Sequence, residues 1–371
     1  MTIELPVTTD FLKIVVENIP LMDVRAPVEF GAGAFPMAVN LPIMDNDDRH
    51  LVGICYKKHG REAAFDLAYK RVSGKLKQQR VDGWVDYHAK NPNALFYCFR
   101  GGMRSKTAQQ WFAEETDIIV DRLEGGYKAF RRFLIESMNP AQINGTPVIL
   151  GGRTGSGKTI LLQQLENSID LEAIANHRGS TFGAFLSPQP TQIDFENRLA
   201  CQLIKHNHRR FSHIVLEDEG SYIGARYIPN ELVQFFKRDT VVLLESDMDD
   251  RVETIHKEYV VAAQKEFFHY SGEEKGLEGW FAGMQAKMMR IKKRLGGERL
   301  KRIVEMLCRG VEEQRKLGQT QFHRKWIELL LTEYYDPMYD YQIEKSGREI
   351  VFSGTFSEVL GYLRNIEKEL I

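Results

Sequence analysis

The stretch that most constrains the fold is PVILGGRTGSGKTILLQQLE, residues 147–166. Its apolar start predicts a buried strand and its end a helix, and between them Gly152, Gly157, Lys158 and Thr159 match the G-x-x-x-x-G-K-S/T pattern. In that pattern backbone N–H groups surround a di- or triphosphate, the lysine neutralises it, and the threonine hydroxyl holds magnesium. We therefore predict a polyphosphate site, with magnesium on Thr159 and no tightly bound cofactor, made by Gly152, Gly155, Ser156, Gly157, Lys158 and Thr159.

Short apolar runs alternate with longer stretches of helical spacing along the whole chain, and this alternation predicts parallel α/β sheets. A chain of 371 residues exceeds what one hydrophobic core usually serves, so we expect two domains. The pattern breaks at residues 136–147, where Asn, Pro and Gly accumulate. After about residue 250 the chain is mostly helical, and Pro337 is expected to end a long helix. The predicted strands are residues 20–24, 94–99, 117–120, 147–152, 213–218 and 240–246.

A second glycine-rich stretch, YCFRGGMRS at residues 97–105, follows a predicted strand and leads into a predicted helix. Backbone N–H groups at such a turn favour anions, and Arg100 and Arg104 add positive charge. Gly101 and Gly102 would allow the tight turn. We expect Cys98 to be a thiolate nucleophile in an anion-binding loop. The loop alone suits both a cysteine phosphatase and a sulfurtransferase that carries a persulfide.

Composition narrows the setting of this chemistry. The four cysteines are far apart, without a C-x-x-C pair, which fits neither a disulfide framework nor a zinc site. The N-terminus lacks the basic and then apolar order of a signal peptide, and no apolar run approaches the roughly 20 residues of a membrane helix. We therefore predict a cytoplasmic protein that has no membrane partner.

Two further sites have plausible structural alternatives. The run HIVLEDEG, residues 213–220, ends in acids, and Glu217 and Asp218 could organise a metal ion or form a solvated turn. Arg251 follows another predicted strand at a helix start, where it could sense phosphate or lie on the surface. The long stretch at residues 176–199, rich in Gly, Ser and Pro, is predicted to be a functional loop.

Residues 287–302 contain eight Lys or Arg and one Glu, in a chain whose formal net charge is −1. Such a segment suits a nucleic-acid backbone, although a solvated helix face is the alternative. The candidate nucleic-acid contacts are Lys287, Arg290, Lys292, Lys293 and Arg294.

The first third of the chain resembles a rhodanese domain. The segment at residues 123–130, LEGGYKAF, is similar to the closing segment of that family. The opening residues occur in the family's order as Asp23, Arg25, Glu29, Gly33, Pro36, Ala38, Asn40 and Pro42. This resemblance covers about the first 135 residues and favours transfer of a chalcogen over phosphatase chemistry. It implies a rhodanese-like parallel-sheet domain at 1–138 with the catalytic cysteine loop. A P-loop NTPase-like α/β domain follows at 145–371, with a helical, basic C-terminal part from about 250.

Six segments together resemble tRNA 2-selenouridine synthases over essentially the whole chain: RHLVGICYKKHGREAA, CFRGGMRS, LEGGYKA, HRGSTFG, VLEDE and YYDPMYDYQ. The resemblance implies that the sulfur of wobble 2-thiouridine in tRNA is exchanged for selenium from selenophosphate. It also implies an S-geranyl intermediate made from geranyl diphosphate, with selenophosphate synthetase as a further candidate partner. Cys98 would then be essential for selenium transfer, with Arg100, Gly101, Gly102 and Arg104 around the anion.

The resemblance leaves the ligand of Lys158 open between geranyl diphosphate and a nucleotide. One residue departs from the expected pattern, because Ala68 stands where the family is expected to carry glycine. If the substrate needs glycine there, the alkylation step would be affected.

Three other functions fit parts of the sequence. An ATP-dependent tRNA sulfurtransferase could use the P-loop to activate the base and a Cys98 persulfide to deliver sulfur. A cysteine phosphatase could be fused to a nucleotide-binding module. A tRNA-binding protein without catalysis would leave Cys98 with no chemical role.

Overall fold

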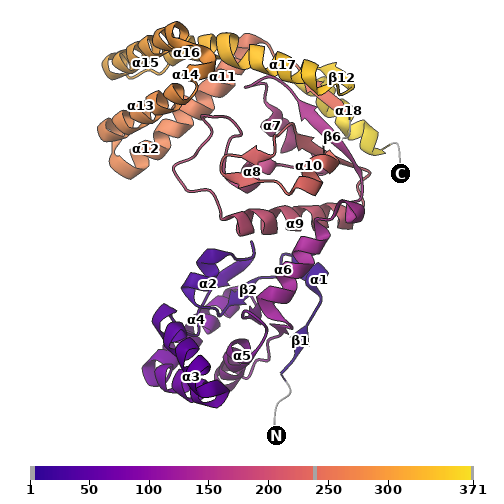
Figure 1. The fold of residues 1–371 in the computed structure, drawn as a ribbon, viewed down its shortest axis with the longest axis vertical. Helices are drawn as coiled ribbons and strands as arrows, with labels where there is room; N and C mark the ends of the chain where they lie inside the picture. Colours follow the sequence, from indigo (N-terminus) through magenta and orange to yellow (C-terminus); the bar gives the residue numbers. More distant parts are fainter. Residues whose placement is uncertain (1–4, 237–239, 369–371) are drawn as a thin grey trace. The chain divides into compact units, whose positions relative to one another are not determined.

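The computed structural model describes residues 5–236 and 240–368, which fall into two compact units (Figure 1). The first unit contains the described residues up to Ile143 together with Thr191–Arg209, and the second contains Asn144–Pro190 and the described residues from Arg210 onwards. The chain therefore leaves the second unit after Pro190 and returns to it at Arg210.

The first unit is built on a parallel sheet with the strand order β1-β5-β4-β2-β3. Its strands have only two or three residues each. All of β2 and most of β4 are buried, whereas Val7 of β1 and Val39 of β3 are exposed. Trp84, Phe96, Trp111 and Phe112 form the centre of its core. The strands are β1 (Val7–Thr8), β2 (Leu21–Asp23), β3 (Ala38–Asn40), β4 (Leu95–Tyr97) and β5 (Arg122–Leu123).

The helices of the first unit include one from the middle of the sequence. Helix α9 packs against α1 and α6 (Figure 1). Its Phe195 is fully buried, and Asn197 Nδ2 donates to Ala34 O at 2.7 Å. The helices are α1 (Phe11–Val16), α2 (Pro27–Ala32), α3 (Asn46–Arg71), α4 (Gly74–Lys90), α5 (Met103–Thr116), α6 (Gly126–Ser137) and α9 (Gln192–Arg209), with a 3-10 turn at Pro140–Gln142.

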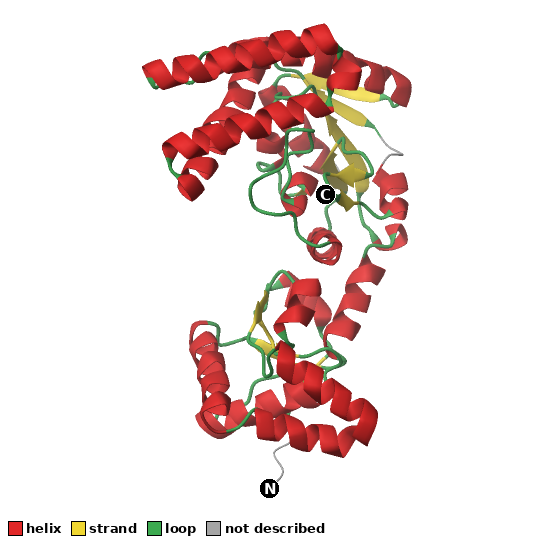
Figure 2. Cartoon of the chain, turned by 60° about the vertical axis from the view of Figure 1, so that its left-hand side comes forward, coloured by secondary structure: helices red, strands yellow, loops and turns green. Residues whose placement is uncertain are grey.

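The second unit is built on another parallel sheet, with the order β12-β11-β6-β8-β7 (Figure 2). Val148, Ile149 and Leu150 of its central strand are all buried, as expected for a strand covered on both faces. The strands are β6 (Thr146–Gly151), β7 (Ser168–Ile169), β8 (His213–Glu217), β11 (Val241–Leu244) and β12 (Ile350–Gly354), and β9 (Tyr222–Ile223) with β10 (Arg226–Tyr227) forms a separate hairpin.

Most of the second unit after residue 247 is helical and has its own core around Trp280, Met288, Leu307 and Trp326. The helices of the unit are α7 (Lys158–Leu162), α8 (Leu171–Ala175), α10 (Asn230–Phe236), α11 (Met248–Ile255), α12 (Ala263–Ser271), α13 (Glu273–Arg290), α14 (Lys292–Leu295), α15 (Gly297–Leu317), α16 (His323–Leu330), α17 (Asp336–Ser346) and α18 (Phe356–Lys368), with π-helical turns at His256–Ala262 and Leu331–Tyr335. Within residues 5–236 and 240–368, no helix combines the length and the apolar character that crossing a membrane requires.

Several local predictions were wrong. Residues 117–120 form no strand, because Asp117 is a left-handed cap of α5 and Ile118 and Ile119 are exposed. Pro337 does not end a helix but lies in the first turn of α17, where its missing N–H is tolerated. The predicted loop at 176–199 ends before Gln192, where α9 begins.

Three predictions about larger segments also need correction. The basic segment at 287–302 is not one helix, because it is divided among α13, α14 and α15, with Gly296 at φ 90° between the last two. The helical C-terminal part contains strand β12, which pairs in parallel with β11 at the edge of the sheet. The contacts of residues 191–209 assign them to the first unit, whereas the domain boundary predicted from the sequence placed them in the second.

Candidate functional site

The cysteine loop lies at the carboxyl end of β4, a central strand of the first sheet. Cys98 is only 3% exposed, and its Sγ lies 3.2 Å from Oγ of Ser105, which is in the first turn of α5. The sulfur therefore lies near the N-terminus of a helix of 14 residues, an environment that stabilises negative charge.

The closing segment predicted from the rhodanese resemblance packs directly on this loop. The N–H of Tyr127 donates to Cys98 O at 2.8 Å, and that of Lys128 donates to Phe99 O at 3.0 Å. Gly101 has φ 62°, and a Cβ there would lie 2.6 Å from Leu123 O, so only glycine fits. Gly102 is different, because its φ is −91° and a Cβ there would meet no described atom within 4 Å.

Arg104 is held by a carboxylate. Its Nη1 and Nη2 donate to the two carboxylate oxygens of Glu29 at 2.6 and 3.1 Å. Burial alone would raise the pKa of Glu29, but the bonds from Arg104 outweigh burial and leave that pKa lowered. Burial opposes the charge of Arg104, whereas Glu29 and the nearby Cys98 favour it, and the net effect is a raised pKa of Arg104. Arg100 is exposed, and among the described residues no carboxylate pairs with it.

Much of the opening segment forms a buried support beneath the loop. Arg25 is 1% exposed and forms an ion pair with Asp23 at 2.6 Å, and Tyr97 donates its hydroxyl to the same carboxylate at 2.6 Å. Asn40 Nδ2 donates to Asp23 O and Arg25 O at 3.1 and 2.9 Å. These residues fix β2, β3 and β4 against one another, and therefore fix the position at which Cys98 emerges.

Ala68, where the sequence departs from the expected glycine, belongs to the same unit. It lines a small pocket of about 60 Å³ together with Met103, Arg104 and Trp111. The methyl group of Ala68 thus reduces space beside the cysteine loop.

In the second unit the P-loop follows β6 and begins α7, as its motif predicts. Gly155 and Gly157 have φ 85° and 91°, and a Cβ on Gly155 would lie 2.7 Å from Arg251 O. Lys158 Nζ donates to Gly152 O at 2.6 Å, so the lysine folds back over its own loop. The Oγ of Ser156 is buried without a hydrogen-bond partner among the described residues. These groups are placed around a space that a phosphate would fill.

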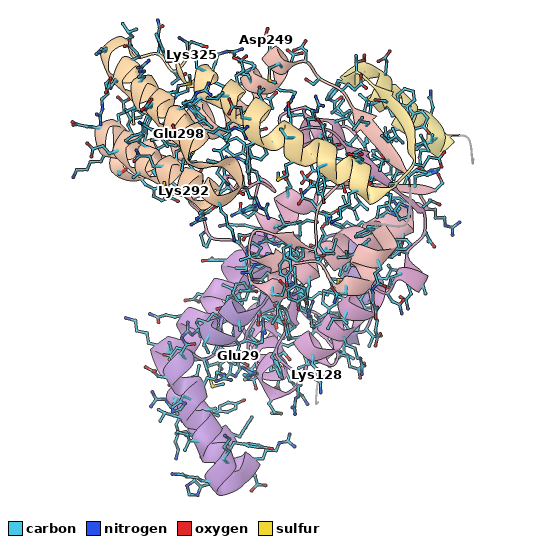
Figure 3. The ribbon with its side chains drawn as sticks, turned by 45° about the horizontal axis from the view of Figure 1, so that its top comes forward. Glu29, Lys128, Asp249, Lys292, Glu298 and Lys325 are labelled. Atoms are coloured by element: carbon cyan, nitrogen blue, oxygen red, sulfur yellow. The ribbon has the colours of Figure 1, made fainter. Side chains whose placement is uncertain are left out.

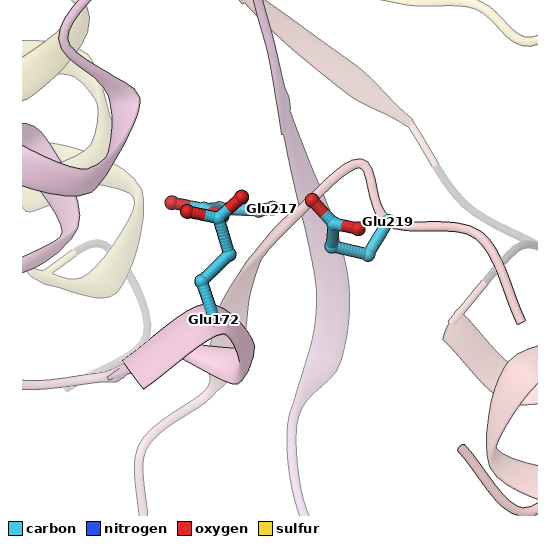
Figure 4. A group of neighbouring side chains, drawn as sticks. All are labelled: Glu172, Glu217 and Glu219. Atoms are coloured by element: carbon cyan, nitrogen blue, oxygen red, sulfur yellow. The ribbon is translucent and has the colours of Figure 1, made fainter. Parts of the chain in front are cut away.

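Three glutamates meet beside this loop (Figure 4). Oxygens of Glu172, Glu217 and Glu219 lie within 4.8 Å of one another. Glu217 ends β8 opposite Leu150 of β6, so the carboxyl ends of neighbouring parallel strands bring it to the P-loop. Thr159 Oγ1 donates to Glu217 Oε1 at 2.9 Å.

Burial and mutual repulsion shift the acidity of these groups. The pKa of Glu172 is raised to about 10, mainly by burial and then by the negative charges of Glu217 and Glu219. Burial raises the pKa of Glu217 to about 7, with Lys158 opposing the rise. Burial also raises the pKa of Glu219. Clustered carboxylates with a threonine hydroxyl form the hard oxygen donor set that Mg²⁺ prefers, and a divalent cation would relieve their repulsion. The residues therefore fit the predicted magnesium, with Glu172 and Glu219 added to Thr159 and Glu217.

The other two predicted phosphate or metal residues are engaged elsewhere. Asp218 accepts from Arg348 Nη2 at 2.6 Å. Arg251 is 2% exposed, donates from both terminal nitrogens to Asp336 at 3.0 and 2.5 Å, and donates from Nε to Thr154 O at 3.0 Å. Arg251 therefore supports the P-loop from behind. The surface alternative for Arg251 is wrong, because the residue is buried.

The P-loop and the glutamates line one cavity of about 340 Å³. Sequence reasoning did not assign Glu172, Glu258, Tyr335 or Tyr339 to this site, and all four also line the cavity. Glu172 closely follows β7, the strand next to β8. An acid at the end of a strand was also the signal that identified Glu217. That strand, β7, has only two residues and no apolar run to reveal it. The predicted loop contributes Arg178, Gly179 and Ser180 to the cavity wall.

The basic segment divides into surface and interior residues. Arg290, Lys292, Lys293 and Arg294 are exposed on α13 and α14 (Figure 3, where Lys292 is labelled). Lys287 instead donates from Nζ to Phe182 O at 2.9 Å, and burial lowers its pKa. Lys287 is therefore half-buried and bonded to a backbone carbonyl, unlike the exposed cations that follow it.

Comparisons with known proteins cover both units. A family model described as the tRNA 2-selenouridine synthase AAA domain matches residues 145–370. The tRNA 2-selenouridine synthase of Sulfurovum sp. (strain NBC37-1) is 49% identical over 364 residues, which are 97% of this chain and 99% of that protein. Those of Hydrogenovibrio crunogenus and Pseudomonas putida (strain GB-1) are 48% and 47% identical, over 96% and 97% of this chain and 98% and 97% of their own lengths. The chain therefore belongs to the tRNA 2-selenouridine synthase family.

Proposed function

We propose that this protein replaces sulfur by selenium in the wobble 2-thiouridine of tRNA, in two steps that use its two anion-binding loops. The observation that carries the proposal is membership in the family over 97% of the chain, in a molecule that has both a cysteine loop and a P-loop. The first loop is suited to selenophosphate and the second to a diphosphate. The rhodanese-like character of the first unit remains a prediction.

In the first step, the sulfur of 2-thiouridine attacks C1 of geranyl diphosphate. The C–O bond breaks, diphosphate leaves, and the base loses its N3 proton, which gives S-geranyl-2-thiouridine. We assign Gly155, Gly157 and Lys158, which line the P-loop cavity, to the diphosphate, and Thr159 with the three glutamates to magnesium. Bound magnesium would supply positive charge to the leaving diphosphate. Lys158 would exchange its bond to Gly152 O for one to the ligand.

In the second step, the selenium of selenophosphate attacks C2 of the base. Geranyl thiol leaves, and water cleaves the Se–P bond to release phosphate and 2-selenouridine. We assign this step to the loop of Cys98, with exposed Arg100 and the N–H groups at the start of α5 binding the anion. Arg104 stays paired with Glu29 and orients the loop.

We further propose that the tRNA backbone binds at Arg290, Lys292, Lys293 and Arg294, without Lys287. Selenophosphate synthetase is the proposed source of the donor. We expect this reaction in the cytoplasm, where its tRNA substrate occurs.

The experiment is nucleoside mass spectrometry of tRNA that carries 2-thiouridine, after incubation with the protein, magnesium, geranyl diphosphate and selenophosphate. Wild type should give 2-selenouridine. Cys98→Ser should accumulate the S-geranyl nucleoside, and Lys158→Ala should leave 2-thiouridine. Cys55→Ser, a cysteine of the same unit, is the matched control and should behave like wild type. Absence of geranyl and selenium masses with wild type would contradict the proposal, and sulfur exchange that requires ATP would favour the sulfurtransferase alternative.

A further inference from the structure

An apolar pocket adjoins the P-loop cavity within the second unit. This pocket, of about 150 Å³, is lined among others by Phe182, Phe185, Phe267, Trp280, Gly283 and Met284. Tyr259 and Arg178 line both the apolar pocket and the P-loop cavity. A narrow gap of about 20 Å³, lined by Ile255, Tyr259, Leu330 and Tyr335 among others, also adjoins both. The phosphate site and the apolar pocket are thus neighbours that share the side chains of Arg178 and Tyr259 as walls.

The polar groups of the apolar pocket already have partners. Arg178 Nη2 lies 3.6 Å from Glu266 Oε1, and its guanidinium lies over the ring of Phe185 at 3.8 Å. Lys287 Nζ donates to Phe182 O. Tyr259 OH lies 3.0 Å from Ser180 Oγ. A nucleobase needs donors and acceptors at its edge, and a buried polar edge without them is strongly disfavoured.

We propose that the apolar pocket holds the hydrocarbon chain of a prenyl diphosphate whose phosphates lie in the P-loop. This inference rests on the proposed function and identifies where the chain of the alkyl donor binds. A cavity of similar volume accommodates a benzene-sized apolar group. The apolar pocket therefore takes the distal isoprene unit, and the proximal one lies in the P-loop cavity beside Tyr259, which lines both spaces.

Gly283 is the residue that sets the accepted chain length. It lies on α13 and lines the apolar pocket, and the nearest atom to a Cβ there would be Phe267 Cζ at 3.9 Å. Gly279, one turn earlier, is already crowded by Phe267, at 3.1 Å from a Cβ. A larger side chain at 283 would occupy pocket space without a clash at its Cβ, and replacing glycine within a helix favours folding.

The test is calorimetric binding of four probes to the full-length protein with magnesium: inorganic pyrophosphate, ADP, and the unreactive thiolo analogues of geranyl and dimethylallyl diphosphate. Wild type should bind the geranyl analogue on the order of 100-fold more tightly than pyrophosphate, because apolar carbons leave water. Gly283→Leu should lose most of that gain while keeping its affinity for pyrophosphate and the dimethylallyl analogue. Gly283→Ala is the matched control and should retain the gain.

Unchanged pyrophosphate affinity in Gly283→Leu also shows that the variant is folded. Equal affinities of wild type for pyrophosphate and the geranyl analogue would overturn the chain pocket while leaving the P-loop assignment intact. The same conclusion follows if ADP binds more tightly than the geranyl analogue and loses affinity in Gly283→Leu. If wild type binds none of the four probes, both the P-loop assignment and the chain pocket fail.

Discussion

The two glycine-rich loops of this protein follow central parallel strands and begin helices, yet they hold their positive charges differently. Arg104 of the cysteine loop donates two hydrogen bonds to the carboxylate of Glu29, whereas Lys158 of the P-loop donates to the carbonyl of Gly152. A bidentate ion pair is strong and directional, and a lysine bond to a neutral carbonyl is readily exchanged for a phosphate. The cysteine loop is thus a fixed frame around its sulfur, and the P-loop is a site whose cation is free to move to a ligand.

The fixed frame predicts a sharp contrast between two adjacent glycines. Gly101→Ala would force a side chain towards Leu123 O at a positive φ, and displacement of the loop should lower selenium incorporation by on the order of 100-fold or more. Gly102→Ala has open space and should stay within about twofold of wild type. Nucleoside mass spectrometry measures both, and geranylation should persist in each variant. Equal losses of selenium incorporation in the two variants would contradict the specific requirement for glycine at position 101.

Replacing Lys158 is predicted to reduce ligand binding at the P-loop without affecting the cysteine loop. Lys158→Ala should weaken magnesium pyrophosphate binding by roughly 100-fold, because the ligand loses its charged partner. Calorimetry measures this loss, with Lys257→Ala, an exposed lysine on the same unit, as the control. Conversion of pre-geranylated tRNA to 2-selenouridine should be unaffected. A parallel fall in that second step would show that the two loops do not act separately.

If both loops act on the same bound tRNA, weaker tRNA binding should slow geranylation and selenium exchange alike. Replacing Lys292, Lys293 and Arg294 with alanine should weaken tRNA binding by about tenfold and reduce the slope of log affinity against log salt by about 2 to 3. Geranylation and selenium exchange should fall together at limiting tRNA. The matched control replaces exposed Lys275, Arg315 and Lys316, and an equal loss there would indicate general charge attraction.

The smallest predicted effect is a change in thermal stability. It is expected in the P-loop cavity, where acids cluster, and not in the cysteine loop, where Glu29 is paired with Arg104. With its folded pKa raised to about 10, Glu172 binds a proton more tightly in the folded state, so its stabilising contribution is complete below pH of about 4.5 and is lost as pH rises towards 10. Glu172→Gln should therefore raise the Tm at pH 8 without magnesium by about 2–8 °C, and change it little at pH 4. Magnesium should stabilise wild type more than the variant. Thermal unfolding scans at both pH values check this, and an unchanged Tm would contradict a cost of burying ionised Glu172 beside Glu217 and Glu219.

Local sequence signals predicted the parts of the fold and site that depend on neighbouring residues. The P-loop motif contains its own strand, turn and helix start, so Gly155, Lys158 and Thr159 could be placed without tertiary information. The strands at β2, β4, β6, β8 and β11 were found for a similar reason, because each is an apolar run between polar segments. The family was also recognised correctly, because its motifs are spread over the whole chain.

What could not be predicted depends on contacts between distant residues. Nothing near Arg104 indicates that Glu29, 75 residues earlier, holds it. Arg251 and Lys287 look like free cations in the sequence, but each is directed inward by acceptors on remote segments. Glu172 was hidden because β7 is too short to give a pattern. A charged residue in a sequence therefore indicates a binding site only where a local motif also determines what that residue contacts.

Helix α9 has a consequence for how this protein can be divided. Because it completes the first unit although it is encoded within the second half of the chain, neither unit corresponds to one continuous piece of the gene. An excised fragment ending at Ile143 would lack the side chains that cover α1 and α6. A recombinant fragment of residues 1–143 is thus an incomplete fold, and exchange of gene segments at that boundary would likewise separate α9 from the unit that it completes.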